Sequence, residues 1–291
     1  MEISILLAEQ ILAMFLTMAV GFGVVRAGLF KTEDSRIISN MVVYICNPCV
    51  VVHSFQIELT DDKIKGLMIA IGLSVVVHMV LIIGSEILSF IFHFNSIEKA
   101  SIIYTNAGYL VIPLVGAVLG EEWVFYTTAF ILVQTVLMWT HGVKLIGQEK
   151  ELNIRKILCN PNVIAMIIGI ALFALEIRLP TVVDSCVSGF GNMISPASMM
   201  VIGMVIGDVD LKWVFRQKRP YLICLLRLIV FPLIAVVAFA GLERSGIHSD
   251  AEYILMIVLI ATSAPAAAMI TQLAQIYGKD SRYASVINVM S

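Results

Sequence analysis

Long apolar runs constrain this chain more than any other feature of its sequence. Runs of about 20 apolar residues recur from one end to the other, each long enough to cross the hydrocarbon core of a bilayer as an α-helix. Of the 291 residues, 59% are hydrophobic and only 14% are charged, with a mean hydropathy of +0.96. Soluble domains do not have this composition. The sequence therefore predicts an all-α polytopic membrane protein.

Nine runs are predicted to span the membrane. Their approximate bounds are 3–25, 35–55, 65–91, 99–119, 123–146, 160–178, 182–206, 220–241 and 252–277. The first run has no positive segment before it and is longer than a signal-peptide core, so we expect it to remain as a membrane helix. Residues 281–291 begin a tenth span, but eleven residues rise only about 16 Å of the roughly 30 Å needed. We therefore expect the last helix to be truncated.

The basic residues predict an orientation. Cytoplasmic loops are enriched in Lys and Arg. The links that follow the odd-numbered spans hold 14 of them, and the links that follow the even-numbered spans hold four. We therefore expect a multi-pass protein of the cell membrane, plasma or inner, with its N-terminus outside.

The spans divide into two inverted halves. Five spans precede the cytoplasmic linker at 147–159, so the half at 160–291 begins on the opposite side of the membrane from the half at 1–146. The prolines support this division: Pro48 corresponds to Pro196 and Pro113 to Pro265, at offsets of 148 and 152 residues. The second half then consists of four spans and the start of a fifth.

Two spans in corresponding positions are interrupted by polar and helix-breaking residues. The fourth span contains Asn106, Gly108 and Pro113, and the ninth contains Thr262, Ser263 and Pro265. Proline removes a backbone donor, and a polar side chain in hydrocarbon is costly unless something binds it. Interrupted helices in both halves are typical of a transporter's binding site. The alternative is that these residues only kink two packed helices.

Four further polar residues lie within the spans. Asn47 precedes Pro48 and is predicted to line the same cavity, as is Gln134, although hydrogen bonds between helices would also explain both. His78 is the candidate proton relay, the alternative being a neutral, hydrogen-bonded histidine. We expect Arg227 to reach the cytoplasmic face or to pair with Glu86, in a structural role.

Several motifs in order along the chain resemble the auxin efflux carrier family. They are Asn106 to Leu114 (NAGYLVIPL), Asn160-Pro161-Asn162, Pro196 to Gly203, Arg227-Leu228 before Pro232, Pro265, Tyr277 to Asp280, and Ala284-Ser285. The resemblance implies ten helices in two inverted repeats whose fourth and ninth helices cross at their breaks, as in bile-acid symporters and some sodium/proton antiporters. The short central linker resembles that of bacterial members, which are associated with the export or uptake of small carboxylates such as malate or malonate.

The same resemblance implies roles for individual residues. Asn106 stands seven residues before the crossover proline, as does the Asn that plant carriers use near their substrate, so Asn106, Pro113 and Pro265 are assigned to the site. Gly108 and Tyr109 belong to the same motif and are included. Val111 replaces a Gly of the plant pattern, which narrows or reshapes the site and argues against auxin as the substrate.

These observations favour a secondary transporter, an efflux carrier or permease, of a small organic anion that works by alternating access. The positive N-terminal ends of the broken helices would hold a carboxylate without any Arg or Lys. Alternatives are a sodium- or proton-coupled carrier of this fold, or a non-transporting membrane sensor. Residues 100–116 and 258–272 contain no Asp or Glu, which disfavours an antiporter.

The remaining expectations concern partners and chemistry. No nucleophile–base pair, metal-ligand cluster or phosphate loop stands out, so neither enzymatic activity nor a cofactor is expected, apart from a coupling Na+ or H+. The expected partners are the anion and the lipid bilayer, with no nucleic acid. A homodimer is left open.

Overall fold

The computed structural model describes residues 2–147, 155, 158–207, 210–243 and 249–291. These residues form helices joined by short links, which confirms the all-α class. Five of the described helical stretches are long and apolar enough to cross a membrane: Thr32–Ser54, Asp61–Phe92, Glu121–Gly147, Thr181–Gly207 and Lys218–Phe239. Shorter apolar helices cover Leu12–Arg26, Pro161–Ala174 and Ala251–Ser263. Most of the predicted linker at 147–159 lies outside the described residues.

The chain forms two compact units. Unit 1 comprises Met1–Thr60, Gly108–Thr128 and Cys159–Leu211, and unit 2 comprises Asp61–Ala107, Ala129–Leu158 and Lys212–Ser291. Each unit therefore draws segments from both of the halves that the sequence predicts. The interrupted fourth span passes from unit 2 to unit 1 between Ala107 and Gly108.

Unit 1 is built from the first, second, sixth and seventh predicted spans and the end of the fourth. Its helices are α1 (Glu2–Arg26), α2 (Ser35–Met41), η2 (Val42–Cys46), α3 (Asn47–Ser54), η3 (Ala107–Val111, which begins at the boundary), α6 (Ile112–Val118), α10 (Pro161–Ala174), α11 (Thr181–Asn192) and α12 (Ile194–Gly207). The rings of Phe55, Phe125 and Phe173 pack against one another with centroids 5.0–6.1 Å apart. This aromatic cluster joins α10 to the residues that follow α3 and to the start of α7 (Val124–Leu137).

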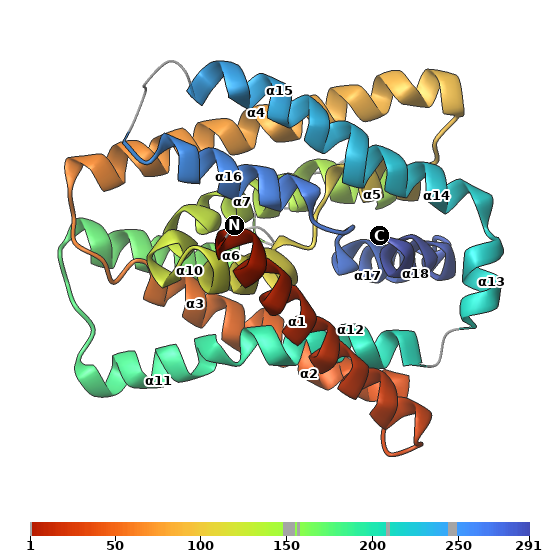
Figure 1. Cartoon of the computed structure of the whole chain (residues 1–291), viewed down its shortest axis with the longest axis horizontal. Helices are drawn as coiled ribbons and strands as arrows, with labels where there is room; N and C mark the ends of the chain where they lie inside the picture. The colour runs from red at the N-terminus through yellow and green to blue at the C-terminus, as the bar shows by residue number, and fades with distance from the viewer. Residues whose placement is uncertain (1, 148–154, 156–157, 208–209, 244–248) are drawn as a thin grey trace. The chain divides into compact units, whose positions relative to one another are not determined.

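Within unit 1, α1 crosses α12 at very short range (Figure 1). A Cβ atom at Gly203 would lie 1.9 Å from the carbonyl oxygen of Met18, and one at Gly21 would lie 2.2 Å from that of Met200. Glycine is thus required on both helices for the backbones to approach this closely, as is common where membrane helices pack.

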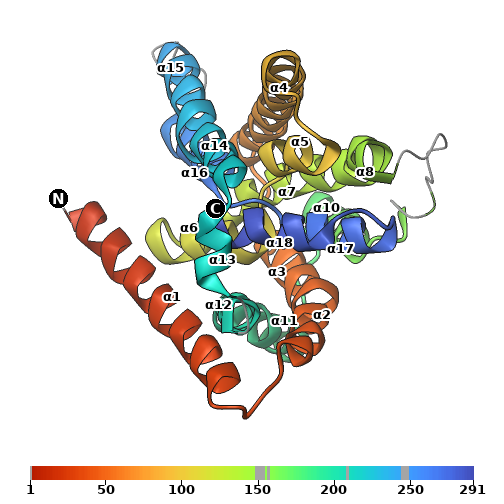
Figure 2. The same cartoon turned by 90° about the vertical axis from the view of Figure 1, so that its right-hand side faces the viewer.

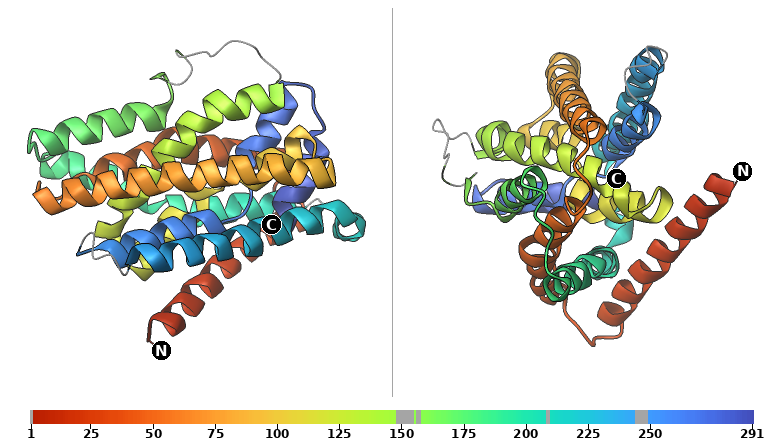
Figure 3. Two further views of the ribbon diagram at one scale, coloured as in Figure 1. Left: turned by 90° about the horizontal axis from the view of Figure 1, so that it is seen from above. Right: turned by 90° about the vertical axis from the view of Figure 1, so that its left-hand side faces the viewer.

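Unit 2 contains the third, fifth, eighth and ninth predicted spans, the first half of the fourth, and the C-terminal helix. Its elements are α4 (Asp61–Phe92), α5 (Ser96–Ile103), the rest of α7, η5 (Met138–Gly142), α8 (Val143–Gly147), α14 (Lys218–Leu225), η6 (Leu226–Val230), α15 (Phe231–Glu243), α16 (Ala251–Ser263), α17 (Ala268–Ile276) and α18 (Ser281–Met290). Helix α13 (Leu211–Arg216) leads into it. Helices α15 and α16 lie side by side (Figures 1 and 3), as do α17 and α18 (Figure 2).

The glycine contact between α1 and α12 gives a stability prediction. Gly203→Ala should lower the melting temperature of the purified protein in detergent, because a methyl group at this position overlaps the Met18 carbonyl and the helices must separate. Overpacking of this kind costs about 1–3 kcal/mol. Gly23→Ala is the matched control, because a Cβ there meets nothing within 4 Å. Alanine also favours the helix, so this variant should melt at or above the wild-type temperature. Equal melting temperatures for the two variants would contradict the prediction.

Candidate functional site

The site begins with α5, whose N-terminus is fixed by a capping box. The Asn95 Oδ1 accepts a hydrogen bond from the Glu98 amide, and the Glu98 Oε2 accepts one from the Asn95 amide, both at 2.9 Å. Two of the otherwise unpaired amides of the first turn are thereby satisfied. Residues at these two positions therefore determine where the first half of the interrupted span starts.

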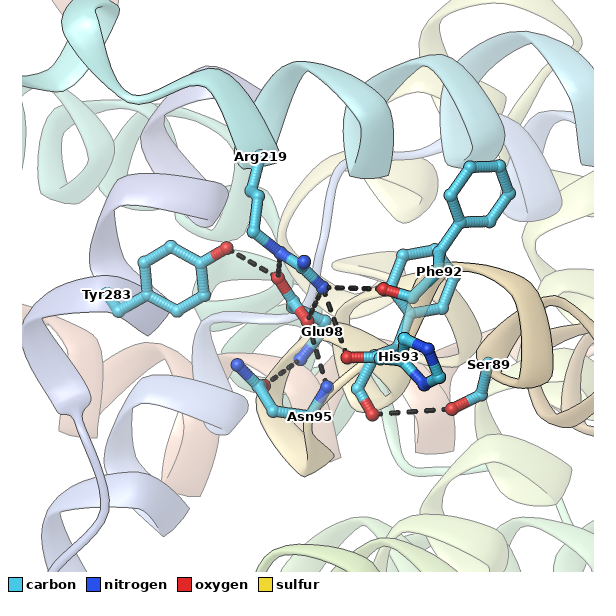
Figure 4. Close-up of polar contacts among 8 residues, drawn as sticks. Ser89, Phe92, His93, Asn95, Glu98, Arg219 and Tyr283 are labelled. Carbon is cyan, nitrogen blue, oxygen red and sulfur yellow. Dashed lines mark hydrogen bonds and ion pairs between the residues drawn. The ribbon is translucent and has the colours of Figure 1, made fainter.

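Glu98 also ties α5 to two other helices of unit 2 (Figure 4). Its carboxylate, fully buried, accepts hydrogen bonds from Arg219 Nε at 2.7 Å and Nη2 at 2.9 Å, and from the Tyr283 hydroxyl at 2.7 Å. The Arg219 Nη2 also donates to the carbonyls of Phe92 and His93. A single carboxylate thus joins α5, α14 and α18.

Helix α5 ends where the chain becomes extended. Tyr104 has φ −98° and ψ 131°, and helical structure resumes only at Ala107, as the π-helix η3 that runs into α6. The break therefore lies at 104–106. Pro113 lies in the first turn of α6, which continues the helical backbone of η3. The proline therefore lies within the second half-helix and does not itself mark the break.

The second interrupted segment breaks in the same way, and the two breaks pair. Helix α16 ends at Ser263, and α17 begins at Ala268. The Asn106 amide donates to the Pro265 carbonyl at 2.8 Å, and the Ala267 amide donates to the Tyr104 carbonyl at 3.0 Å, around an antiparallel bridge between Thr105 and Ala266. Two extended stretches within apolar segments thus satisfy each other's backbone groups. We call this paired region, 104–106 and 264–267, the crossing.

Gln134 on α7 also pairs with the crossing. Its Oε1 accepts hydrogen bonds from the Thr105 amide (2.8 Å) and hydroxyl (2.9 Å), and its Nε2 donates to the Thr105 carbonyl at 2.8 Å. The side chain replaces the partners that Thr105 would have in a helix. The structure therefore places Gln134 as a clamp on the backbone of the crossing.

Arg227 also lies at the crossing, which its position in the sequence does not predict. It is only 1% exposed, and its Nε donates to the Ala264 carbonyl at 2.9 Å while its Nη1 donates to the Ile102 carbonyl. The prediction that it reaches the cytoplasmic face is wrong, because its side chain is buried at the crossing. The prediction that it pairs with Glu86 is also wrong, because Glu86 pairs with Lys99 at 2.7 Å. The expectation of a crossing without any Arg or Lys is also wrong. A lone arginine eight residues inside an apolar run was the available signal.

The other predicted residues of unit 2 are Thr262, Ser263, Asn106 and His78, and they differ in their contacts. The Thr262 and Ser263 hydroxyls donate to the carbonyls of Val258 and Leu259, one turn back on their own helix. Asn106 is 6% exposed. His78 is fully buried, with Nδ1 bonded to the Ser74 carbonyl at 2.7 Å and its ring 4.7 Å from that of Phe130. The role of His78 as a proton relay stays a prediction.

The predicted residues of unit 1 lie around the start of α6. A Cβ at Gly108 would lie 2.9 Å from the Asn47 Nδ2, so Gly108 makes room for this buried amide, whose Oδ1 has no described partner. The side chain of Tyr109 lies outside the described part of the structure. Pro113 lines a cavity of about 540 Å³. The polar and charged residues that line this cavity are His53, Ser54, Gln56, Glu121, Glu122, Ser188, Asn192 and Ser195.

The chain was compared with known proteins. A family model described as membrane transport protein matches residues 6–153 and 149–291, which together cover almost the whole chain. A sequence search of curated proteins found no relative. Among the described residues, no group of three or more His, Cys, Asp or Glu side chains is placed to hold a metal ion.

The Glu98 cluster predicts a pH-dependent loss of stability. Burial raises the pKa of Glu98, but the hydrogen bonds from Arg219, Tyr283 and Asn95 outweigh it, so the net pKa is lowered. The stabilisation should be present above the pKa of the unfolded chain and be lost as the pH falls through the lowered pKa of the folded protein. Glu98→Gln should therefore lower the melting temperature at neutral pH, with hydrogen bonds to a charged group contributing about 1.5–3 kcal/mol.

The control for Glu98 is Glu86→Gln. The Glu86 side chain is 46% exposed and pairs with Lys99, and exposed pairs contribute at most about 1 kcal/mol. Glu86→Gln should melt close to the wild type. A melting temperature of Glu98→Gln that equals that of Glu86→Gln at every pH would refute the role given to Glu98.

The clamp at the crossing gives a second prediction. Gln134→Leu should lower the melting temperature and speed hydrogen exchange at the Thr105 amide, because it leaves buried backbone groups unpaired at about 1–3 kcal/mol each. Thr140→Val is the control, since the Thr140 hydroxyl donates only to carbonyls of its own helix, Val136 and Leu137. Unchanged exchange at Thr105 in Gln134→Leu would show that the clamp does not hold the break.

Proposed function

Because the chain belongs to the auxin efflux carrier family of membrane transport proteins, we propose that it is a secondary transporter of a small organic anion that binds at the crossing. In this proposal the chain has nine spans and the start of a tenth, arranged as two inverted repeats in the cell membrane. The family supports a membrane transporter, and the anion, the site and the alternating-access mechanism are our inference.

The observation that carries the proposal is the paired break of two apolar segments. Unpaired peptide groups are costly in hydrocarbon, and irregular backbone at membrane depth is tolerated only where it is buried in protein or lines a cavity. Here Asn106, Thr105 and Pro265 take part in an extended pairing that a purely structural bundle does not need. Such a break is typical of the substrate site of a carrier.

The charges around the crossing favour an anion. Arg227 brings a full positive charge to it, while 100–116 and 258–272 hold no acidic residue. The second half-helices start directly after the paired stretches, at Ala107 and Ala268, and a helix N-terminus acts as about half a positive charge. The Arg227 Nη2 has no described partner, so the guanidinium keeps a free donor. A small carboxylate such as malate or malonate fits these features.

The cavity of unit 1 also supports the proposal, because the second half of the fourth span lines it. Helix α6 lines it with Ile112, Pro113 and Ala117, so the second half of the interrupted span borders open space. Most of its polar lining residues are neutral hydrogen-bonding groups, which can accompany an anion without holding it tightly. Glu121 and Glu122 add negative charge, which favours release of an anion over its retention.

Transport in proteoliposomes tests the proposal. Wild-type protein should move radiolabelled malate or malonate faster than indole-3-acetate, and Asn106→Ala should lose most of this flux while reaching the membrane normally, because Asn106 lies within the crossing. The control is Asn40→Ala, which removes an exposed asparagine of α2 and should leave flux unchanged. The substrate class is wrong if neither dicarboxylate is transported or shifts the melting temperature, and the site is wrong if Asn106→Ala transports normally.

A further inference from the structure

The carbonyl ends of the two broken helices meet at one side chain. Ile102 is the penultimate residue of α5 and Ala264 is the C-cap of α16, so both carbonyls belong to the last turn, where no helical amide remains to pair with them. Arg227 donates to both. In carriers with discontinuous helices, carbonyl groups at half-helix C-termini are the ligands that coordinate a coupling Na+. Here these groups are occupied by a guanidinium.

We infer that Arg227 is a tethered cation that takes the place of a coupling ion at the crossing, so that the carrier binds its anion without sodium. The role of Arg227 as a bound cation is argued from the geometry of unit 2. Its effect on anion binding rests on the proposed transport function.

The charge balance supports this assignment. Each helix C-terminus acts as about half a negative charge, so the ends of α5 and α16 together offset the one charge of Arg227. Within the described residues, the ion pairs of unit 2 join Lys63 to Asp250, Lys99 to Glu86 and Arg219 to Glu98, and no carboxylate pairs with Arg227. A buried charge without compensation costs several kcal/mol. The two negative helix ends therefore compensate the positive charge of Arg227, and Arg227 in turn compensates the negative charge of the helix ends.

The backbone near Arg227 fits this role. The residue lies in η6, a single π-helical turn between α14 and α15, and π-helical turns are frequent at functional sites. Arginine also suits the place better than lysine, because its planar fork reaches two carbonyls at once and its charge is permanent. With Arg227 offsetting the negative helix ends, the positive ends at Ala107 and Ala268 remain for the anion.

The test compares Arg227→Ala with wild type in choline, sodium, lithium and low, non-denaturing guanidinium chloride at equal ionic strength. Wild type should melt at the same temperature in choline and sodium. Arg227→Ala should melt several degrees lower in choline and recover part of that loss in guanidinium, sodium or lithium, because a small cation can enter the vacated place. The matched control is Ile146→Ala, a fully buried apolar truncation in unit 2 that should be destabilised but gain nothing from any cation.

Arg227→Lys keeps the positive charge but loses the planar guanidinium that reaches both carbonyls. Its melting temperature in choline should fall between those of wild type and Arg227→Ala. The inference is overturned if a folded Arg227→Ala responds to the four cations as Ile146→Ala does. If Arg227→Ala does not fold, wild type still decides: a sodium-dependent melting temperature, or dicarboxylate flux that requires a sodium gradient, overturns the inference. Absence of flux for every anion would refute the proposed substrate. The melting temperatures in the four cations would still decide whether Arg227 takes the place of a bound cation.

Discussion

The structure of unit 2 depends on the pairing of peptide groups where two apolar helices break. An unpaired amide or carbonyl in an apolar interior is more destabilising than most side-chain contacts are stabilising. A helix break there is therefore stable only if the backbone groups that it leaves unpaired find other partners. Backbone bonds between 104–106 and 264–267 satisfy some of these groups. Gln134 satisfies both backbone groups of Thr105, and Arg227 satisfies the helix ends at Ile102 and Ala264. The Ser291 hydroxyl also accepts a hydrogen bond from the Ala266 amide, so five separate stretches of the chain hold one interruption.

This dependence explains the burial of polar groups around the crossing. Gln134 and Arg227 are expensive to bury alone, but each takes up backbone groups that would otherwise be unpaired. Further out, Glu98 fixes the start of α5 and links it to α14 and α18, so the half-helix that ends at the crossing is held at both ends (Figure 4). A rigid half-helix keeps the breaks in register, which a binding site requires.

Arg227 also changes the electrostatic picture of the site. A crossing lined only by dipoles would hold an anion through the N-terminal ends alone, while the negative C-terminal ends opposed it. With a guanidinium on those C-terminal ends, the opposition is removed and a net positive charge remains. For the anion that we propose, Glu121 and Glu122 in the cavity of unit 1 would disfavour retention.

The sequence by itself determined the features that composition and local chemistry control. Apolar runs of membrane length predict the helical class, and Asn106, Pro113, Thr262 and Pro265 indicate which two segments are interrupted, because polar side chains are costly within such a run and proline disfavours an unbroken helix. The motifs around them indicate the family. Only the tertiary structure decided that the break lies at 104–106, that Gln134 clamps Thr105, and that Arg227 binds the ends of both half-helices and leaves Glu86 to Lys99. The reason is physical: a hydrogen bond between residues on different helices leaves no periodicity or spacing in the sequence, and the partner of a buried charge is set by how the helices pack.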